Sequence, residues 1–166
     1  MPTRILVAGI GNMFLGDDGF GCEVAQRLAA DPPGDGVRVV DYGVRGMHLA
    51  YDLLDGYEAV ILVDALRGRE PPGTLRVLEV GENDLGAAGL DAHAMDPATV
   101  LASVRALGGR LPRTLVVGCV PAGLDDGIGL SPSVAAAVEP AVATVRALLE
   151  DELATHPDRS TTAAEG

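Results

Sequence analysis

The sequence has no tryptophan, only two cysteines, and half as many basic as acidic residues. Twelve Lys and Arg stand against 24 Asp and Glu, which gives a net charge of −12. A surface of this sign repels polyphosphates, so we expect no nucleic-acid partner. Cys22 and Cys119 form neither a CxxC pair nor a disulfide framework, and we expect both to be buried, reduced thiols.

Long uncharged apolar runs are also missing. None reaches the roughly 18 to 20 residues that a membrane-spanning helix needs. The apolar segment 5–11 has the character of a signal-peptide core, but GDDG follows it where a small-residue cleavage site would stand. We therefore expect a cytoplasmic protein with no membrane contact.

Apolar runs and amphipathic segments alternate along the chain, and 48% of its residues are hydrophobic. A chain of 166 residues is long enough to bury the core of one domain. We predict a single α/β domain over residues 1–154 and a disordered polar tail over 155–166. Strands are predicted at 4–9, 37–41, 58–65, 74–80 and 113–120, and helices at 20–30, 47–54, 97–107 and 132–154, the last one bent at Pro140.

The link between the third and fourth strands fixes their relative direction. Residues 66–73 are too few for a parallel crossover, which needs about a dozen, so the fourth strand is predicted to run antiparallel to the third. The fold is then a three-layer α/β/α sandwich around a mostly parallel, mixed five-stranded sheet. With the first strand between the second and third, ligands bind at the switch point outside the carboxyl ends of the strands.

Carboxylates from two strands meet at that switch point. The loop after the first strand, GIGNMFLGDDGFG at 9–21, brings Asp17 and Asp18, and the third strand ends in Asp64. Burying a single unpaired charge after a run as apolar as AVILV is costly, and a capping role explains one such residue. Two carboxylates in one crevice favour a cation site.

A histidine in the long loop 81–95 completes a possible metal site. His93 belongs to no apolar periodicity, whereas His48 and His156 are assigned to a helix surface and to the tail. With Asp64 and one carboxylate of the adjacent pair Asp17 and Asp18, it gives a metal three protein ligands and leaves coordination positions open for water or substrate.

A nucleotide-binding module is the first alternative. The fingerprint GxGxxG requires glycine at position 14, where Phe14 stands, and Asp17 and Asp18 would repel a pyrophosphate. Asp41, which ends the second strand, does occupy the place of a ribose-binding acid. The sequence contains no P-loop and no GxSxG nucleophile motif.

Five segments in order resemble the hydrogenase maturation endopeptidases, which trim the large subunit of NiFe hydrogenases. These segments are GIGNMFLGDDGFG, DYGVRGMHL, VDALRGREPPGT, DAHAMDPATVL and VGCVPAGLDDGIGLSPSVAAAVEPAV. The resemblance covers residues 4 to about 150, and five motifs at matching spacing make it specific.

The resemblance implies roles for individual residues. It assigns the catalytic and metal-binding positions to Asp18, Asp64 and His93, which leaves Asp17 to cap the following helix. It also implies substrate contacts at Asp41 and Gly43. The turn that holds these two departs from the family pattern, because Tyr42 and Val44 replace a glycine and a threonine.

The implied function is cleavage of one peptide bond in the hydrogenase large-subunit precursor after nickel has been inserted. The nickel is expected to arrive with the precursor, and a divalent ion held by the enzyme itself is the alternative. We expect a monomer. A non-catalytic protein that binds a metal-loaded client stays open, and so does a peptidyl-tRNA hydrolase, although Met13 and the absence of a His-Asn pair disfavour the latter.

Overall fold

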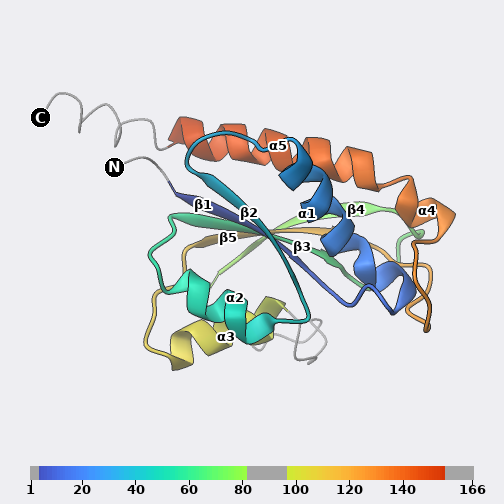
Figure 1. The fold of residues 1–166 in the computed structure, drawn as a ribbon, viewed down its shortest axis with the longest axis horizontal. Helices are drawn as coiled ribbons and strands as arrows, with labels where there is room; N and C mark the ends of the chain where they lie inside the picture. The colour runs from blue at the N-terminus through green and yellow to red at the C-terminus, as the bar shows by residue number, and fades with distance from the viewer. Residues whose placement is uncertain (1–3, 82–96, 156–166) are drawn as a thin grey trace, which may run out of the picture.

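The computed structural model describes residues 4–81 and 97–155. It shows a five-stranded sheet between two pairs of long helices, with α1 and α5 on one face and α2 and α3 on the other (Figure 1). The elements in order are β1 Ile5–Ile10, η1 Gly16–Gly19, α1 Phe20–Ala30, β2 Val37–Gly43, α2 Gly46–Leu53, β3 Ala59–Ala65, β4 Leu75–Val80, α3 Pro97–Ala106, β5 Arg113–Cys119, α4 Pro132–Ala135 and α5 Val138–Thr155. The predicted three-layer α/β/α fold is confirmed.

The sheet has the strand order β2-β1-β3-β5-β4. Strands β2, β1, β3 and β5 pair in parallel, and β4 pairs with β5 in the antiparallel direction. The predicted direction of the fourth strand is therefore right. β4 follows β3 in the chain but does not lie beside it, because β5 inserts between them.

The side chains of the sheet alternate between two cores. Ile5, Val7, Ile61 and Val63 pack with α1 and α5, whereas Leu6, Ala8, Val60 and Leu62 pack with α2 and α3. Helices cover both faces of the sheet, so the side chains of β3 are buried whichever face they point to. This explains the uninterrupted apolar run before Asp64.

Two glycines of the opening motif allow α1 to touch the sheet backbone. A Cβ on Gly9 would lie 2.2 Å from the carbonyl oxygen of Gly21, and a Cβ on Gly21 would lie 2.1 Å from that of Val63. Both distances are shorter than any real carbon contact. These glycines therefore serve helix–sheet packing, and the packing carries the loop that precedes α1 to the carboxyl ends of β1 and β3.

The C-terminal helix is broken at residues 136–137, before the position of the predicted bend. It forms two helices, α4 and α5, with residues 136–137 between them, and Pro140 lies in the first turn of α5. A proline there removes no intrahelical hydrogen bond, so the predicted bend at Pro140 is wrong. The stretch Pro132–Thr155 is long and apolar enough to cross a membrane by length and composition alone. The apolar residues that α5 buries, such as Val145 and Leu149, belong to the core against the sheet.

Candidate active site

Asp18 and Asp64 come together at the carboxyl edge of the sheet, beside Gly11. Asp64 is the next-to-last residue of β3 and is 7% exposed, and its Oδ1 accepts the N–H of Ala65 at 2.8 Å. Asp18 lies in η1, and its Oδ2 accepts the N–H of Asn12 at 2.7 Å. A Cβ on Gly11 would lie 2.0 Å from the carbonyl oxygen of Asp18 and 3.6 Å from Oδ1 of Asp64. The two predicted acids thus flank one short stretch of backbone.

The pKa of the Cys22 thiol is sensitive to the negative charge at this edge of the sheet. Its Sγ donates to the carbonyl oxygen of Gly11 at 3.5 Å, and the side chain is buried. Burial raises the pKa of Cys22 to about 12, assisted by a hydrogen bond to Asp41 and by the negative charges of Asp41, Asp18 and Asp64. The negative charges of these three carboxylates therefore all reach the buried thiol of Cys22, which shows that this edge of the sheet is acidic.

The metal-ligand set is only partly described. His93, the predicted nitrogen ligand, lies outside the described residues. Within 4–81 and 97–155, no three His, Cys, Asp or Glu side chains are placed to hold a metal ion. Asp18 and Asp64 offer oxygen donors, which suit divalent cations, and a third ligand would have to come from His93, water or substrate.

The turn that contains Asp41 and Gly43 lies next to these acids. Asp41 accepts the N–H of Gly43 at 3.1 Å through Oδ1 and the amide of Gln26 at 3.0 Å through Oδ2. Gly43 has a φ of +58°, and its carbonyl oxygen accepts the N–H of Gly11 at 3.0 Å. Gly43 thus connects the end of β2 to the residue after β1, and Asp41 connects β2 to α1 through Gln26. The substrate contacts predicted for both residues stay a prediction.

Asp17 does not cap α1, and the prediction that it does is wrong. The N-cap position of α1 is Gly19, and η1 separates Asp17 from the first turn of the helix. The Asp17 side chain is 1% exposed and accepts the N–H groups of Ala122, Gly123 and Ser131 at 2.8, 3.1 and 2.7 Å. It also accepts the hydroxyl of Ser131 at 2.9 Å, and this hydroxyl makes no capping hydrogen bond to α4.

These hydrogen bonds change the pKa of Asp17. Burial by itself raises the pKa of this carboxyl group, but the hydrogen bonds from Ser131, Ala122 and Gly123 together lower it below the ordinary value. Asp17 is therefore a structural anion of the site. Its partners lie more than 100 residues away in the chain, and no local spacing points to them.

The loops after β1 and β5 are joined to each other. Leu15 and Gly127 form a parallel bridge, in which Gly16 donates to Gly127 and Gly127 donates to Phe14, both at 2.8 Å. Asp17 adds a backbone bond to Gly123 at 3.1 Å. Because β1 and β5 flank β3 in the sheet, the joined loops lie at the carboxyl end of β3, which carries Asp64.

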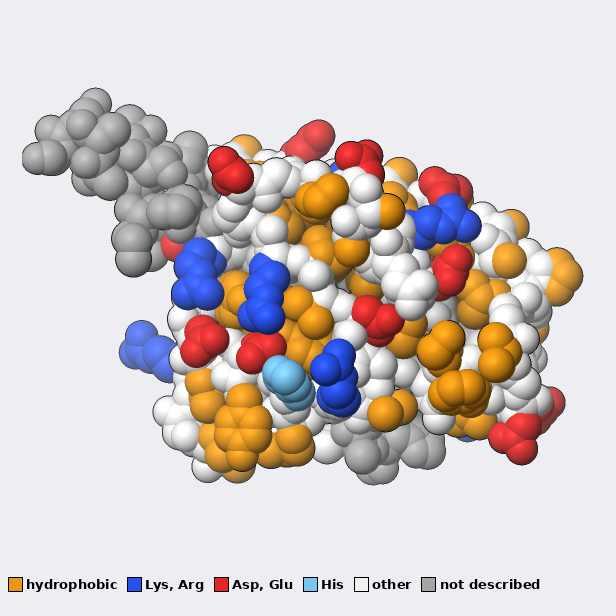
Figure 2. Space-filling model, in the orientation of Figure 1, with side chains coloured by type: hydrophobic (Ala, Val, Ile, Leu, Met, Phe, Trp, Pro, Cys, Tyr) orange, Lys and Arg blue, Asp and Glu red, His pale blue; other side chains and the backbone are white. Residues whose placement is uncertain are grey.

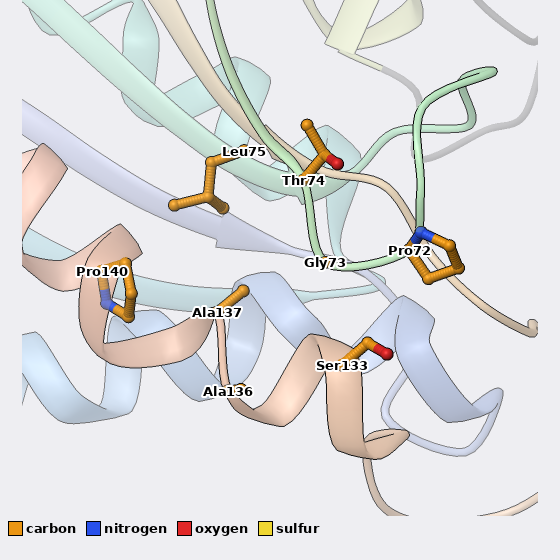
Figure 3. Close-up of a pocket in the computed structure, with 8 residues that line it drawn as sticks. All are labelled: Pro72, Gly73, Thr74, Leu75, Ser133, Ala136, Ala137 and Pro140. Atoms are coloured by element: carbon orange, nitrogen blue, oxygen red, sulfur yellow. The ribbon is translucent and has the colours of Figure 1, made fainter.

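A separate shallow pocket lies beside the start of β4 (Figure 3). Its lining residues are Pro72, Gly73, Thr74, Leu75, Ser133, Ala136, Ala137 and Pro140. None of these has an ionisable side chain, and Gly73 is pressed against Ser133, whose carbonyl oxygen would lie 2.6 Å from an added Cβ. We assign no chemistry to this pocket.

Comparison with known proteins identifies the family. The family model HycI, described as hydrogenase maturation protease, matches residues 22–148. This match covers well over half of the chain.

The chain belongs to the hydrogenase maturation protease family.

Individual relatives extend the match to the opening loop. The hydrogenase 2 maturation protease of Escherichia coli is 32% identical over 152 residues, which cover 89% of this chain and 92% of the relative. A putative hydrogenase maturation protease of Methanocaldococcus jannaschii is 35% identical over 146 residues, covering 83% and 91%. The structure of the hydrogenase maturating endopeptidase HybD from E. coli superposes with a TM-score of 0.77 at 31% identity, over 90% of this chain and 94% of that one.

Membership makes this maturation protease a hydrolase and supports the function that the motifs implied. It favours that interpretation over a nucleotide-binding module and over a peptidyl-tRNA hydrolase. The site has features that fit a hydrolase: one carboxylate from β3 and one from η1 lie beside Gly11, and negative charges from three carboxylates act on the neighbouring Cys22. The structure places Asp18 and Asp64 beside Gly11, while their catalytic and metal-binding roles stay a prediction. The anchoring role of Asp17 was missed.

Proposed function

We propose that this protease removes the C-terminal extension of a NiFe hydrogenase large-subunit precursor after nickel insertion. The family supports the processing of a hydrogenase. The observation that carries the more specific proposal is the approach of Asp18 and Asp64 to Gly11 in a strongly negative environment, since a cation on the precursor would be attracted there. The protein would act as a cytoplasmic monomer on a protein client.

In this proposal the nickel of the precursor is part of the substrate. Asp18 and Asp64 supply oxygen ligands to it and His93 a nitrogen ligand, so the ion is held next to the bond to be cut. A divalent ion in this position polarises a carbonyl group or lowers the pKa of a bound water. The precursor without nickel brings no cation, and the carboxylates then repel one another and gain nothing from its binding.

The Asp17 anchor and the turn at Asp41 have supporting roles. Asp17 fixes the loop before Asp18 against residues 122–131, and Asp41 fixes Gly43 against Gly11. Both sets of hydrogen bonds restrict the motion of the backbone that carries the proposed reacting carboxylates. Rigid placement of reacting groups is a large part of enzymatic rate enhancement.

The deciding experiment compares nickel-loaded and nickel-free precursor. The purified protease, freed of metals by a chelator and then desalted, is mixed with each form, and loss of the C-terminal extension is followed by mass spectrometry. We expect cleavage of the loaded form only. Equal cleavage of both forms would refute the role of nickel, and binding of the loaded precursor without shortening would identify a non-catalytic binder.

A second arm distinguishes the source of the metal. If the protease held its own divalent ion, the chelated enzyme would be inactive on nickel-loaded precursor until zinc or another divalent ion was restored. Under our proposal the chelated enzyme is already fully active on that precursor.

A further inference from the structure

Several large apolar side chains are exposed around the acidic site, on the loops after β1, β2 and β5 and at the start of α2. Phe14 is 60% exposed and Ile128 is 74% exposed, and Met13, Val44 and Met47 are each between 46% and 58% exposed. Figure 2 shows a group of apolar side chains at the right of this face, over the region where β1 ends and α1 begins in Figure 1. Burial of such side chains by a partner is favourable because it removes apolar area from water.

The backbone beneath Phe14 and Ile128 is held in place. The N–H of Phe14 donates to Oδ1 of Asn12 at 2.9 Å, and its carbonyl oxygen accepts the N–H of Gly127, the residue before Ile128. Asp17 fastens the two loops from below. A surface that is already ordered loses little conformational entropy when a partner binds.

The charge of the site indicates what kind of segment binds there. Asp18, Asp41 and Asp64 put negative charge at the centre, and the whole chain carries −12. An acidic segment is repelled from this centre, and the exposed side chains of Phe14 and Ile128 offer apolar area that an apolar segment would bury. The apolar side chains around a negative centre are complementary to an uncharged, apolar segment that carries a cation at one point.

We propose that Phe14 and Ile128 form a docking surface for an uncharged apolar segment of the hydrogenase precursor that lies next to the bond to be cut. This inference rests on the proposed function, and it adds a recognition element that is separate from the metal ligands. The joined loops present both side chains at the same edge as Asp18 and Asp64, so one extended segment reaches the docking surface and the carboxylates together.

Steady-state cleavage of nickel-loaded precursor tests the proposal. We expect Phe14→Ser, Ile128→Ser and the double variant to raise KM by roughly tenfold or more while kcat stays within about twofold of the unchanged protein. Phe14→Leu keeps an apolar side chain and should restore a KM close to the original. The matched control is Val77→Ser, because Val77 is 47% exposed on β4 at the far edge of the sheet.

Two results would overturn the docking surface. One is an unchanged KM in the double variant, and the other is a fall in kcat with KM unchanged, which would mean that the loops only shape the site. Thermal unfolding of each variant checks that the fold is retained. If the unchanged protein does not cleave the precursor, the proposed function fails. In that case, equilibrium binding of nickel-loaded precursor to the same variants still shows whether Phe14 and Ile128 contribute to precursor binding.

Discussion

Asp17 accepts hydrogen bonds from both the amide and the hydroxyl group of Ser131, at 2.7 and 2.9 Å, across 114 residues of sequence. With Ala122 and Gly123, it satisfies four donors through one buried carboxylate. This contact connects the loop that carries Asp18 to the loop that precedes α4.

Replacement of Asp17 should therefore be costly. We expect Asp17→Ala to lower the free energy of unfolding by about 2 kcal/mol or more, because it leaves donors without an acceptor in a buried place. Urea denaturation measures the change. Asp35→Ala, at an exposed position, should change the stability by no more than about 0.5 kcal/mol. A similarly small effect at Asp17 would contradict the anchoring role.

The same contact predicts a dependence of stability on pH. The pKa of Asp17 in the folded protein lies below the ordinary value of 3.8, so on acidification the unfolded chain binds the proton first. The contribution of Asp17 is complete above that value and is lost as the pH falls through the lower, folded pKa. Between about pH 6 and pH 3, the unfolding free energy should fall more steeply for the unchanged protein than for Asp17→Asn. Parallel slopes would refute this.

The proposed ligands are tested by substitutions that remove charge and keep shape. Asp18→Asn and Asp64→Asn should each lower cleavage of nickel-loaded precursor by at least roughly a hundredfold, with His93→Ala as the third variant. Stability should be retained, since each Asn substitution relieves repulsion between carboxylates. Asp151→Ala, an exposed carboxylate on α5, serves as the control. Unimpaired cleavage by either Asn variant would remove that residue from the mechanism.

Gly11 offers a test of the narrow space between the acids. Gly11 and Gly34 have φ values of +136° and +114°, so alanine strains the backbone at both positions. A Cβ added at Gly11 collides with the backbone of Asp18, whereas a Cβ added at Gly34 has no atom within 4 Å. We expect Gly11→Ala to destabilise the fold by at least about 1 kcal/mol more than Gly34→Ala and to abolish cleavage. Equal effects in denaturation and activity would show that Asp18 tolerates displacement.

Cys22 is expected to be chemically inert in the folded protein. With its pKa raised to about 12 and its side chain buried, it holds almost no thiolate near neutral pH. Alkylation followed by peptide mass spectrometry should show slow labelling of Cys22 in buffer and rapid labelling in urea. Cys22→Ala should retain cleavage. If Cys22→Ala kept its fold but no longer cleaved the precursor, a covalent mechanism through this thiol would be indicated.

Local pattern and strand topology were enough to predict the sheet and to bring the pair Asp17 and Asp18 to the same edge as Asp64. The run before Asp64 and the short link after it predicted a buried strand and the direction of β4, whereas the choice of Asp18 over Asp17 came from the family resemblance. The neighbour of β4 was not predicted, because pairing in the sheet depends on β5, which comes later in the chain. Asp17 was assigned to the nearest helix end because the sequence shows only which residues are close along the chain. It does not show that a serine 114 residues away lies beside Asp17 in the fold.

The proline in the last helix illustrates a different limit. Pro140 marks an interruption, but the pattern does not reveal whether the helix bends at the proline or ends before it and begins again. The structure has the second arrangement, with Pro140 in the first turn of α5. His93, which the sequence proposes as a ligand, lies outside the described residues and stays a prediction.

The long reach of the Asp17 contacts has a consequence for the order in which the protein becomes active. A chain emerging from the ribosome contains Asp18 and Asp64 well before it contains Ser131, and contacts of such sequence separation form late in folding. We therefore expect the nascent protease to be unable to cut until nearly all of its sequence has been made.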